Sequence, residues 1–399
     1  MWCLMRKSAH FILIIVLAFI SILFLACPDD PEPQPTNCEY PPGNRTFTWR
    51  VDTVAWFGTS TVAGVWAFSD NDAYVMGGII DGKPPYSGRF GRHWNGETWE
   101  DDINGTWGYN DVTEEWGDIS IGPLGDVTGD DHFMVAVGYW GLNQDIYAGI
   151  AEFDNRIKKW KSYQLQATGE LRSVWTDGKG FFIAAGDNGM VYTKDGYKAG
   201  WIYSKAPTEF SLFNVRGVSK NELYFRGDYA APGIHYTQIW RLYGGAWVKL
   251  LDNQDTTNTP IKIPEAGYDI YDIAVSRCSI TDSLILYIIG DESFIFESLG
   301  LNLEFTKTNL TYLGLPLKQN GRTGTDINLF TPNDVWIFGT RYNFYHWNGT
   351  DFQKIVMPGL PDDDAHFGDQ RKMIKTSSGK IFLPTEVSSQ VYVVVQGTP

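Results

Sequence analysis

Short apolar runs alternate with turn residues along this chain, and Thr331–Phe352 shows the pattern most clearly. The stretch reads TPNDVWIFGTRYNFYHWNGTDF and contains two apolar runs, Val335–Phe338 and Phe344–Trp347. The TPND before them favours a bend, because Pro fixes φ while Asn and Asp hydrogen-bond to the nearby backbone. The Asn-Gly pair after the second run is the dipeptide that most favours a two-residue hairpin turn. The stretch therefore predicts a strand, a short loop, a strand, a turn and a third strand.

The same unit recurs along the chain. Ser69–Gly78 followed by Arg92–Glu100 is a less regular copy of Thr331–Phe352. The tetrapeptide HWNG occurs in both, beginning at His93 and at His346. Copies follow one another at intervals of roughly 40 to 65 residues, which is the range of propeller repeats. In chain order they are Val62–Asp102, Ile119–Trp160, Leu171–Trp201, Phe213–Trp247, Ile270–Ser298, Thr331–Phe352 and Arg371–Val395.

The two ends of the repeat array predict how it closes. The seventh copy has only three strands, whereas an additional strand, Thr46–Val54, precedes the first copy. If this strand pairs with Gln390–Val395, it completes the last blade and removes the sheet edge that this blade would otherwise expose. We therefore predict an all-β fold, a seven-bladed β-propeller closed by an N-terminal strand. Six or eight blades remain alternatives, because the second and fifth copies match the pattern weakly.

The repeat resembles one of bacterial propellers, S-x-x-D-V-W-x-V-G followed by I-x-H-W-D-G-x-x-W. Phe330–Phe352 and Phe68–Trp99 carry this resemblance best, and it extends over nearly all of the chain beyond the N-terminal segment. Kelch and Asp-box propellers are similar at this level, so the resemblance implies a fold and no particular activity. Thr193–Gly196 with Trp201 differs from an Asp box in the position of its glycine, which disfavours a sialidase.

The N-terminal segment predicts export and a membrane anchor. Arg6 and Lys7 precede the uncharged apolar run Phe11–Ala26, which is short for a membrane span and typical of a signal peptide. The run ends in FLAC, which resembles a bacterial lipobox with Cys27 as the lipidated residue, although its first two residues depart from the usual box. A plain secretory signal, with Cys27 incidental, is the alternative.

An acidic, Pro-rich stretch, CPDDPEPQP, follows the signal peptide and predicts a stiff, extended tether. Acidic residues directly after the lipidated cysteine resemble the surface-export signal of lipoproteins in Bacteroidetes-type bacteria. We therefore divide the chain into a signal peptide at 1–26, a lipidated tether at 27–44 and a propeller at 45–399. The resemblance implies attachment to the bacterial outer membrane, with the propeller exposed on the cell surface.

Composition narrows the class of partner. The chain has 399 residues, of which 15% are aromatic, and a net charge of −15. A negative field repels phosphate backbones, so nucleic acid is disfavoured as a partner. Four cysteines are too few for a disulfide scaffold. We expect a monomer that meets the membrane through its lipid.

Turn lengths predict two unlike faces. The first and second strands of a blade are joined by short turns, which lie on what we call the short-turn face: Ser69–Asp72, Asp177–Gly180, Ser219–Asn221, Thr331–Asp334 and Ser377–Lys380. Longer connections lie on the opposite, long-loop face: Ile79–Arg89, Asp102–Asp118, Tyr139–Tyr147, Asp228–Thr237, Leu251–Tyr268, Leu310–Thr325 and Pro358–Gly368. Long loops in compact domains are often functional.

Aromatic residues of the long-loop face are the candidate ligand-binding residues. Aromatic rings beside Asp and Asn suit stacking on sugars or contacts with a protein partner. The alternative is a purely structural role, in which these rings only cover the ends of the blades. The candidates are Tyr86, Trp107, Tyr109, Trp116, Tyr139, Trp140, Tyr229 and Tyr342.

The chain contains neither a G-x-S-x-G nucleophile elbow nor a phosphate-binding loop. The histidines after the signal peptide lack metal-ligand spacing, and the equivalent positions of His93 and His346 favour a packing or turn role over catalysis. We predict no metal site and no cofactor. Asp126–Asp131 could ligate Ca²⁺, but it lacks the closing Glu of an EF-hand, and an acidic turn is the favoured interpretation. Paired carboxylates for glycoside hydrolysis stay open, because the sequence does not give their separation.

These observations favour a lipid-anchored surface propeller that binds a glycan or a protein through its long-loop face, and that is not an enzyme. The alternatives are a glycan-active hydrolase or lyase with carboxylates near the channel mouth, and a structural subunit of an envelope complex. The strand Thr46–Val54 enters the ring from the short-turn face, so we expect the tether to leave there. Cys38 and Cys278 lie toward the same side, and a disulfide between them is left open.

Overall fold

The computed structural model divides the chain into two compact units, Met1–Pro35 and Thr36–Pro399. It describes residues 38, 40–56, 61–80, 88–101, 120–121, 125–142, 145–231, 234–255, 258–262, 269–299, 304–310, 326–339, 344–357, 372–388 and 391–399. The predicted signal peptide and Cys27 lie outside the described residues. Within the described residues, no helix has the length and apolar character that a membrane span requires.

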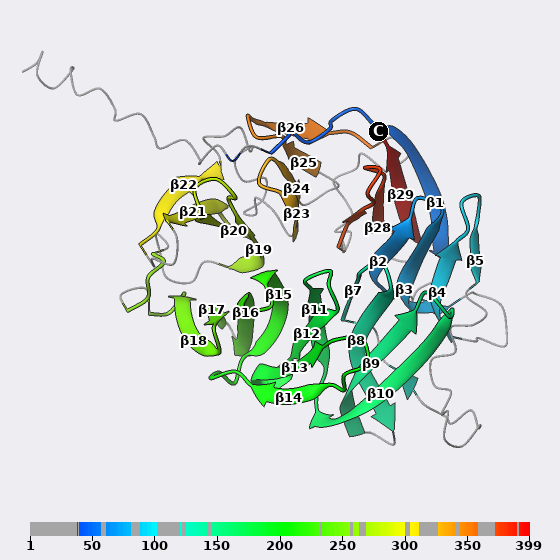
Figure 1. Ribbon diagram of the computed structural model, residues 1–399, viewed down its shortest axis with the longest axis horizontal. Coiled ribbons are helices and arrows are strands. Elements are labelled where there is room, and N and C mark those ends of the chain that lie inside the picture. Colours follow the sequence, from blue (N-terminus) through cyan, green and yellow to red (C-terminus); the bar gives the residue numbers. More distant parts are fainter. Residues whose placement is uncertain are drawn as a thin grey trace, which may run out of the picture. The chain divides into compact units, whose positions relative to one another are not determined.

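The second unit is a ring of seven antiparallel sheets (Figure 1), which confirms the predicted seven-bladed β-propeller. Blade 1 holds β2 (Thr61–Ser69), β3 (Asp72–Ile80), β4 (Gly88–Trp94) and β5 (Trp99–Asp101). Blade 2 holds β6 (Ser120–Ile121), β7 (Asp126–Gly129), β8 (Phe133–Leu142), β9 (Asp145–Asp154) and β10 (Lys159–Thr168). Blade 3 holds β11 (Leu171–Thr176), β12 (Phe181–Gly186), the short 3₁₀ turn η1 (Asp187–Gly189), β13 (Met190–Asp195) and β14 (Ile202–Lys205).

The remaining blades follow in chain order. Blade 4 holds β15 (Ser211–Ser219), β16 (Glu222–Ala231), β17 (Ile234–Tyr243) and β18 (Ala246–Asp252). Blade 5 holds β19 (Ile270–Arg277), β20 (Ser283–Gly290), β21 (Phe294–Leu299) and β22 (Thr306–Asn309). Blade 6 holds β23 (Asp326–Thr331), β24 (Asp334–Phe338), β25 (Phe344–Trp347) and β26 (Phe352–Ile355). Blade 7 holds β27 (Ile374–Lys375), β28 (Ile381–Ser388), β29 (Val391–Thr398) and β1 (Thr48–Trp56).

The ring is closed by the N-terminal strand, as predicted. β1 pairs antiparallel with β29, from Thr48 opposite Thr398 to Trp56 opposite Val391. Blade 7 therefore takes its outermost strand from the start of the propeller and its inner strands from the end. Closure leaves the last blade with a full set of strands and the outer edge of β29 paired.

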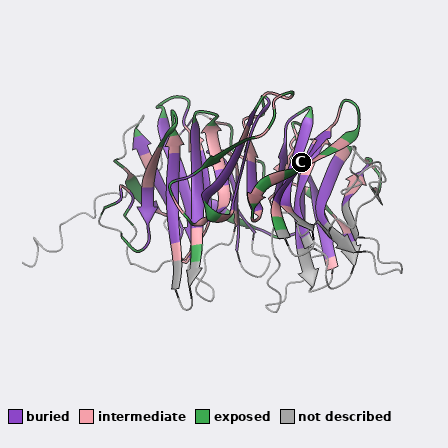
Figure 2. Cartoon of the chain, turned by 90° about the horizontal axis from the view of Figure 1, so that it is seen from below, coloured by how far each residue is buried: buried purple, intermediate pink, exposed green. Residues whose placement is uncertain are grey.

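Burial explains why the middle strands are continuously apolar. Each blade packs between two others, so its second strand is covered on both faces (Figure 2), and every residue of β12 and β20 is buried. A short, continuous apolar run bounded by turns is the sequence pattern of such a strand. The core consequently lies between blades, as a series of apolar clusters around the ring.

Two of the predicted long loops are instead strands. Tyr139–Tyr147 continues the β8–β9 ladder to the pair Leu142–Asp145, and Asp228–Thr237 continues the β16–β17 ladder to the pair Ala231–Ile234. The loop prediction was wrong at these two places. The aromatic and β-branched residues there favour extended pairing, so the hairpins run on past the edge of the blade.

His346 lies in a buried hydrogen-bonded cluster that joins two blades. Its ring is fully buried, its Nε2 lies 2.8 Å from Asp334 Oδ1, and it stacks on Trp336 with ring centroids 4.4 Å apart. The Trp336 indole N–H donates to the same carboxylate at 3.1 Å, and Lys375 of blade 7 donates to its other oxygen. Burial by itself would raise the pKa of Asp334, but the hydrogen bonds from His346 and Lys375 hold it below its ordinary value.

Blade 1 repeats this cluster in a more exposed form. His93 Nε2 lies 2.8 Å from Asp72 Oδ1, and the His93 ring stacks on Tyr74 at 4.5 Å. Lys158 of blade 2 donates to the second oxygen of Asp72 at 2.9 Å. The predicted packing role of His93 and His346 is thus confirmed, and the acidic residue of the repeat links its blade to the next one.

Candidate functional site

Residues 38 and 40–47, here called the strap, cross the short-turn face over blades 5 and 6. Cys38 forms a disulfide with Cys278, in the turn after β19, with the two Cα atoms 5.4 Å apart. The Asn333 side-chain amide donates to the carbonyl oxygens of Cys38 and Tyr40, at 3.0 and 2.7 Å. The strap therefore has a covalent and a hydrogen-bonded attachment to the ring, and the disulfide left open by the sequence is present.

The strap continues close to the buried histidine. A Cβ on Gly43 would come within 2.5 Å of the His346 ring, so only glycine fits at this contact. Arg45 then pairs with Asp351 at 2.9 Å, in the turn between β25 and β26. These contacts confirm that the chain approaches β1 along the short-turn face.

A cavity of about 540 Å³ lies on the ring axis and opens on the same face. Each of the seven innermost strands, or the turn next to it, contributes to its wall, and Asp177 and Gly178 of the β11–β12 turn stand at its rim. We call it the axial pocket. A site at this place can use side chains from every blade, so its lining is scattered through the sequence.

Aromatic rings form part of the pocket wall. Trp66 of blade 1, Trp175 of blade 3 and Phe330 of blade 6 line it. The indole N–H of Trp66 is buried and has no hydrogen-bond partner among the described residues. Buried indole groups usually find a partner, but this one lies against the backbone of Gly129 in blade 2.

Two cations lie at the inner end of the pocket. Arg216 contacts both carboxylate oxygens of Asp272 at 3.3 Å. The nearest acceptors of Lys372 Nζ are the carbonyl oxygens of Val127 and Val174, both at 3.4 Å, with Asp126 Oδ2 at 3.9 Å. Burial lowers the pKa of Lys372, although the charge of Asp126 opposes that shift. These long contacts leave the ammonium group weakly satisfied, since N–H···O bonds are ordinarily 2.7–3.2 Å.

The carboxylates on the axis serve mainly to join blades. Asp126 of blade 2 accepts the backbone N–H of Val174 in blade 3 at 3.1 Å, and Asp272 of blade 5 accepts that of Ile327 in blade 6 at 3.0 Å. Burial and the neighbouring Asp272 raise the pKa of Asp326 well above its ordinary value, which favours its protonated form. A hydrogen-bonded ring of this kind fixes the inner strands and gives the pocket a rigid floor.

Two other blade junctions use the same bond with neutral side chains. The Ser173 hydroxyl accepts the backbone N–H of Val215, and the Asn328 side-chain oxygen accepts that of Met373, both at 3.1 Å. This hydrogen bond joins successive blades whether its acceptor is a carboxylate or a neutral group. The positions of the axial acids are therefore explained without a catalytic role.

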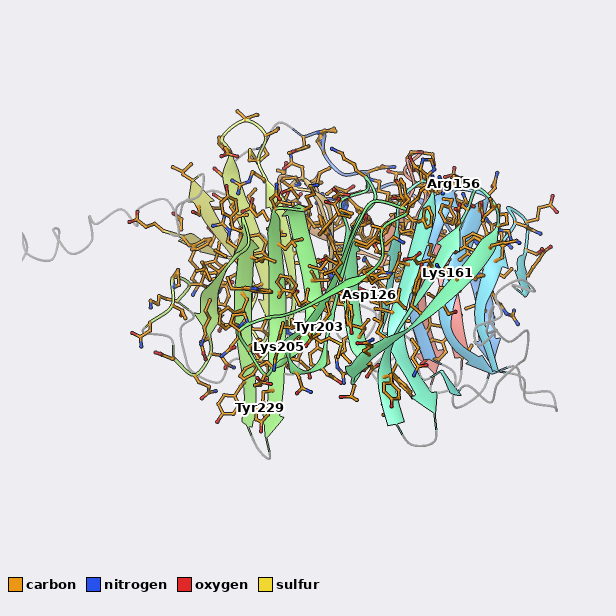
Figure 3. The ribbon with its side chains drawn as sticks, turned by 60° about the horizontal axis from the view of Figure 1, so that its bottom comes forward. Asp126, Arg156, Lys161, Tyr203, Lys205 and Tyr229 are labelled. Atoms are coloured by element: carbon orange, nitrogen blue, oxygen red, sulfur yellow. A yellow bond between two sulfur atoms is a disulfide. The ribbon has the colours of Figure 1, made fainter. Side chains whose placement is uncertain are left out.

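The predicted ligand-binding aromatics are only partly placed. Tyr86, Trp107, Tyr109, Trp116 and Tyr342 lie outside the described residues, and so does the side chain of Trp140. Tyr139 is half-buried on β8, and Tyr229 is 51% exposed at the end of β16. Figure 3 shows Tyr229 at the edge of the ring opposite Arg156, which lies in the β9–β10 turn. No described contact joins Tyr139 to Tyr229.

Tyr229 does have aromatic neighbours. Its ring stacks on Phe210 at 5.7 Å and lies 6.1 Å from Tyr236. The described part of the long-loop face thus carries one small aromatic patch, on blade 4. The prediction that this face binds a ligand stays a prediction.

In the segment Asp126–Asp131, Asp126–Gly129 is strand β7, and Asp130 and Asp131 begin the turn that follows it. Asp130 Oδ1 accepts the backbone N–H groups of His132 and Phe133, both at 2.8 Å, and its Oδ2 accepts the Tyr197 hydroxyl at 2.9 Å. Across the described residues, no three His, Cys, Asp or Glu side chains are grouped so as to hold a metal ion.

The sequence did not reveal the residues of the axial pocket. One signal was available: Val-Trp occurs at equivalent places in two inner strands, at Val65–Trp66 and at Val174–Trp175. Lys372 and Arg216 had no such signal, because each belongs to one blade only. Lys372 and Arg216 become neighbours only because closure of the ring brings the inner strands of blades 7 and 4 to the same axis.

Comparison with known proteins supports the fold alone. No family model and no curated protein matches the chain. A solved structure of YCF48 bound to D1 peptide aligns with a TM-score of 0.54 at 13% identity, covering 90% of this chain and all of that one. YCF48 from Cyanidioschyzon merolae gives 0.55 at 13% identity, over 88% and 99% of the two chains. The WD40 domain of Neurospora crassa Pan2 gives 0.51 at 10% identity, over 90% and 98%.

Proposed function

We propose that this chain is a non-enzymatic, lipid-anchored propeller of the bacterial surface, and that it binds a segment of a partner protein in its axial pocket. The axial pocket is the feature of the structure that supports this proposal. It combines aromatic walls, an arginine and a weakly satisfied lysine in a cavity of about 540 Å³. Apolar walls with a few convergent polar groups are the usual composition of a binding site.

The positions of Asp126 and Asp272 on the axis are explained by a structural role. A glycosidase needs one carboxyl group free to donate a proton and a second free to act as nucleophile or base. Asp126 and Asp272 already accept backbone N–H groups from the next blade, and neutral residues do the same elsewhere in the ring. The related fold of YCF48 has been solved with a peptide bound, so a propeller of this kind can hold a peptide.

The strap relates the pocket to the proposed anchor. If Cys27 carries the lipid, the free tether ends at the disulfide of Cys38 and spans at most about 40 Å. Both the strap and the pocket lie on the short-turn face. An anchored propeller would therefore turn its pocket toward the membrane, which suits a partner that is itself part of the envelope. The long-loop face would point outward.

Selection from a random peptide library on the purified mature protein tests the binding proposal. We expect enriched peptides whose affinity falls at least tenfold in Trp175→Ala, where a pocket wall is removed, and is unchanged in Tyr229→Ala on the opposite face. Enriched peptides that still bind Trp175→Ala would place the site elsewhere. Steady release of reducing sugar from a polysaccharide by the same protein would contradict the non-enzymatic assignment.

The anchor is tested separately. In cells, Cys27→Ser should release the protein from the membrane or leave an unprocessed precursor, because the lipid acceptor is gone. Membrane partitioning and mature mass identical to the native protein would show that Cys27 carries no lipid.

A further inference from the structure

A second cavity, of about 560 Å³, lies on the outer rim between blades 2 and 3. β10 of blade 2 forms one side, and β13 and β14 of blade 3 form the other. We call it the rim groove. Figure 3 shows Tyr203 of β14 and Lys161 of β10 on the outer side of the ring. The rim groove shares no lining residue with the axial pocket, so the two could be occupied together.

A break in the β10 ladder opens the rim groove. Gln164 pairs with Gly149, but the next pair is Thr168 with Tyr147, so three residues of β10 stand opposite one residue of β9. Such bulges re-aim side chains and are frequent beside binding sites. Gln164, Leu165, Gln166 and Ala167 all line the cavity; the two glutamines are exposed, whereas Leu165 and Ala167 are partly buried against the core.

Aromatic rings form the other side. Tyr192, Trp201 and Tyr203 line the groove, with the two tyrosine ring centroids 5.3 Å apart. Tyr192 is buried, whereas Tyr203 is 51% exposed. A half-exposed aromatic ring presents a large apolar area on which a flat or ring-shaped ligand can stack.

Trp201 is held in place by a buried ion pair. Its indole N–H donates to Glu152 at 2.7 Å, and the same carboxylate accepts Lys194 at 2.7 Å and the Tyr163 hydroxyl at 3.1 Å. Glu152 and Lys194 are almost fully buried. The ring is thus pre-organised, and a ligand that stacks on it need not order it.

The exposed polar side chains of the groove are neutral. No charged side chain lines it. In the described part of the chain, the amides of Gln164 and Gln166 and the hydroxyl of Tyr203 have no hydrogen-bond partner. A glutamine amide offers donors and an acceptor side by side, which match the neighbouring hydroxyl groups of a sugar. A charged peptide would find no opposite charge here.

We propose that the rim groove binds a neutral glycan chain, with a sugar ring stacked on Tyr203 beside Trp201 and sugar hydroxyls bonded to Gln164 and Gln166. The site would lie on the side wall of the propeller, away from both faces. It does not depend on the axial pocket or on its protein partner, and either site can fail without the other.

Affinity gel electrophoresis of the full mature chain tests this proposal. The probes are four neutral polysaccharides (xyloglucan, galactomannan, laminarin and soluble starch) and two anionic ones (polygalacturonate and alginate). We expect at least one neutral polysaccharide to retard the protein, with affinity reduced at least tenfold in Tyr203→Ala and in Gln166→Ala. Ile202→Ala is the matched control, since Ile202 is 67% exposed on the same strand but does not line the groove.

Gln166 is exposed, so Gln166→Ala should leave the melting temperature unchanged. A loss of binding in this variant therefore cannot be attributed to a loss of folding. Three results would each overturn the proposal: no retardation by any neutral polysaccharide, retardation by the anionic ones only, or equal retardation of Tyr203→Ala and the native protein. Equal losses in Ile202→Ala and Tyr203→Ala would also count against it, because the effect would then not belong to the groove.

Discussion

Removing Asp334 should destabilise the propeller far more than removing its equivalent in blade 1. Asp334 is 5% exposed and accepts hydrogen bonds from His346, Trp336 and Lys375. Asp334→Ala leaves two buried donors and a lysine without their acceptor. Breaking a buried ion pair from one side costs about 3–5 kcal/mol. The side chain of Asp72 is 23% exposed and its partner Lys158 is 51% exposed, so Asp72→Ala should cost about 1 kcal/mol.

The assay is urea unfolding followed by tryptophan fluorescence, compared as free energies of unfolding. With a slope of about 3 kcal/mol per molar urea, Asp334→Ala should lower the midpoint by roughly 1 M or more. Asp351→Ala is a control in the same blade, because Asp351 is 59% exposed and its pair with Arg45 contributes at most about 1 kcal/mol. If Asp334→Ala and Asp72→Ala lower the free energy of unfolding equally, the buried cluster does not link the blades as described.

Three further outcomes follow from the same contacts. Deleting β1 should expose β29 and cause aggregation or a large fall in melting temperature, and a stable monomeric product would refute the closure of blade 7. Cys278→Ser opens a loop of 240 residues and should lower the free energy of unfolding by at most about 5 kcal/mol. Reduction of the native protein should cause the same loss. A free energy of unfolding that does not change with reductant would mean that the disulfide is not formed. The folded-state pKa of Asp334 lies below its unfolded value, so its contribution is present above about pH 4 and is lost as pH falls through the folded pKa. Acid unfolding should therefore show a steeper loss of stability in the native protein than in Asp334→Asn, and parallel curves would argue against this.

The sequence predicted the blades because each repeat carries its own turn chemistry. The Asn-Gly of the Thr331–Phe352 unit forms the β25–β26 turn, where Gly349 adopts a φ of 91° that favours glycine. The closing strand was predictable because three strands at one end require a fourth. The disulfide could be suspected but not assigned, since its formation depends on the path of the strap.

The loops and the pocket were harder to predict, for physical reasons. Turn residues mark where a hairpin can end, yet Asp228–Thr237 stays paired because its aromatic residues extend the ladder. Lys372 and Arg216 meet only after the ring closes, and their sequence neighbours do not mark them. The rim groove depends on a three-residue break in one ladder, which alternation along β10 does not reveal.

The central claim is that the axial pocket holds a segment of a partner protein, and photocrosslinking in intact cells tests it most directly. Phe330 lines the pocket and differs from p-benzoylphenylalanine only by the added benzoyl group, so the photoreactive residue is placed there and, for comparison, at Tyr229 on the opposite face. On irradiation we expect a discrete adduct with an envelope protein from position 330 and none from position 229. An adduct from position 229 alone, or none from position 330, would contradict the account.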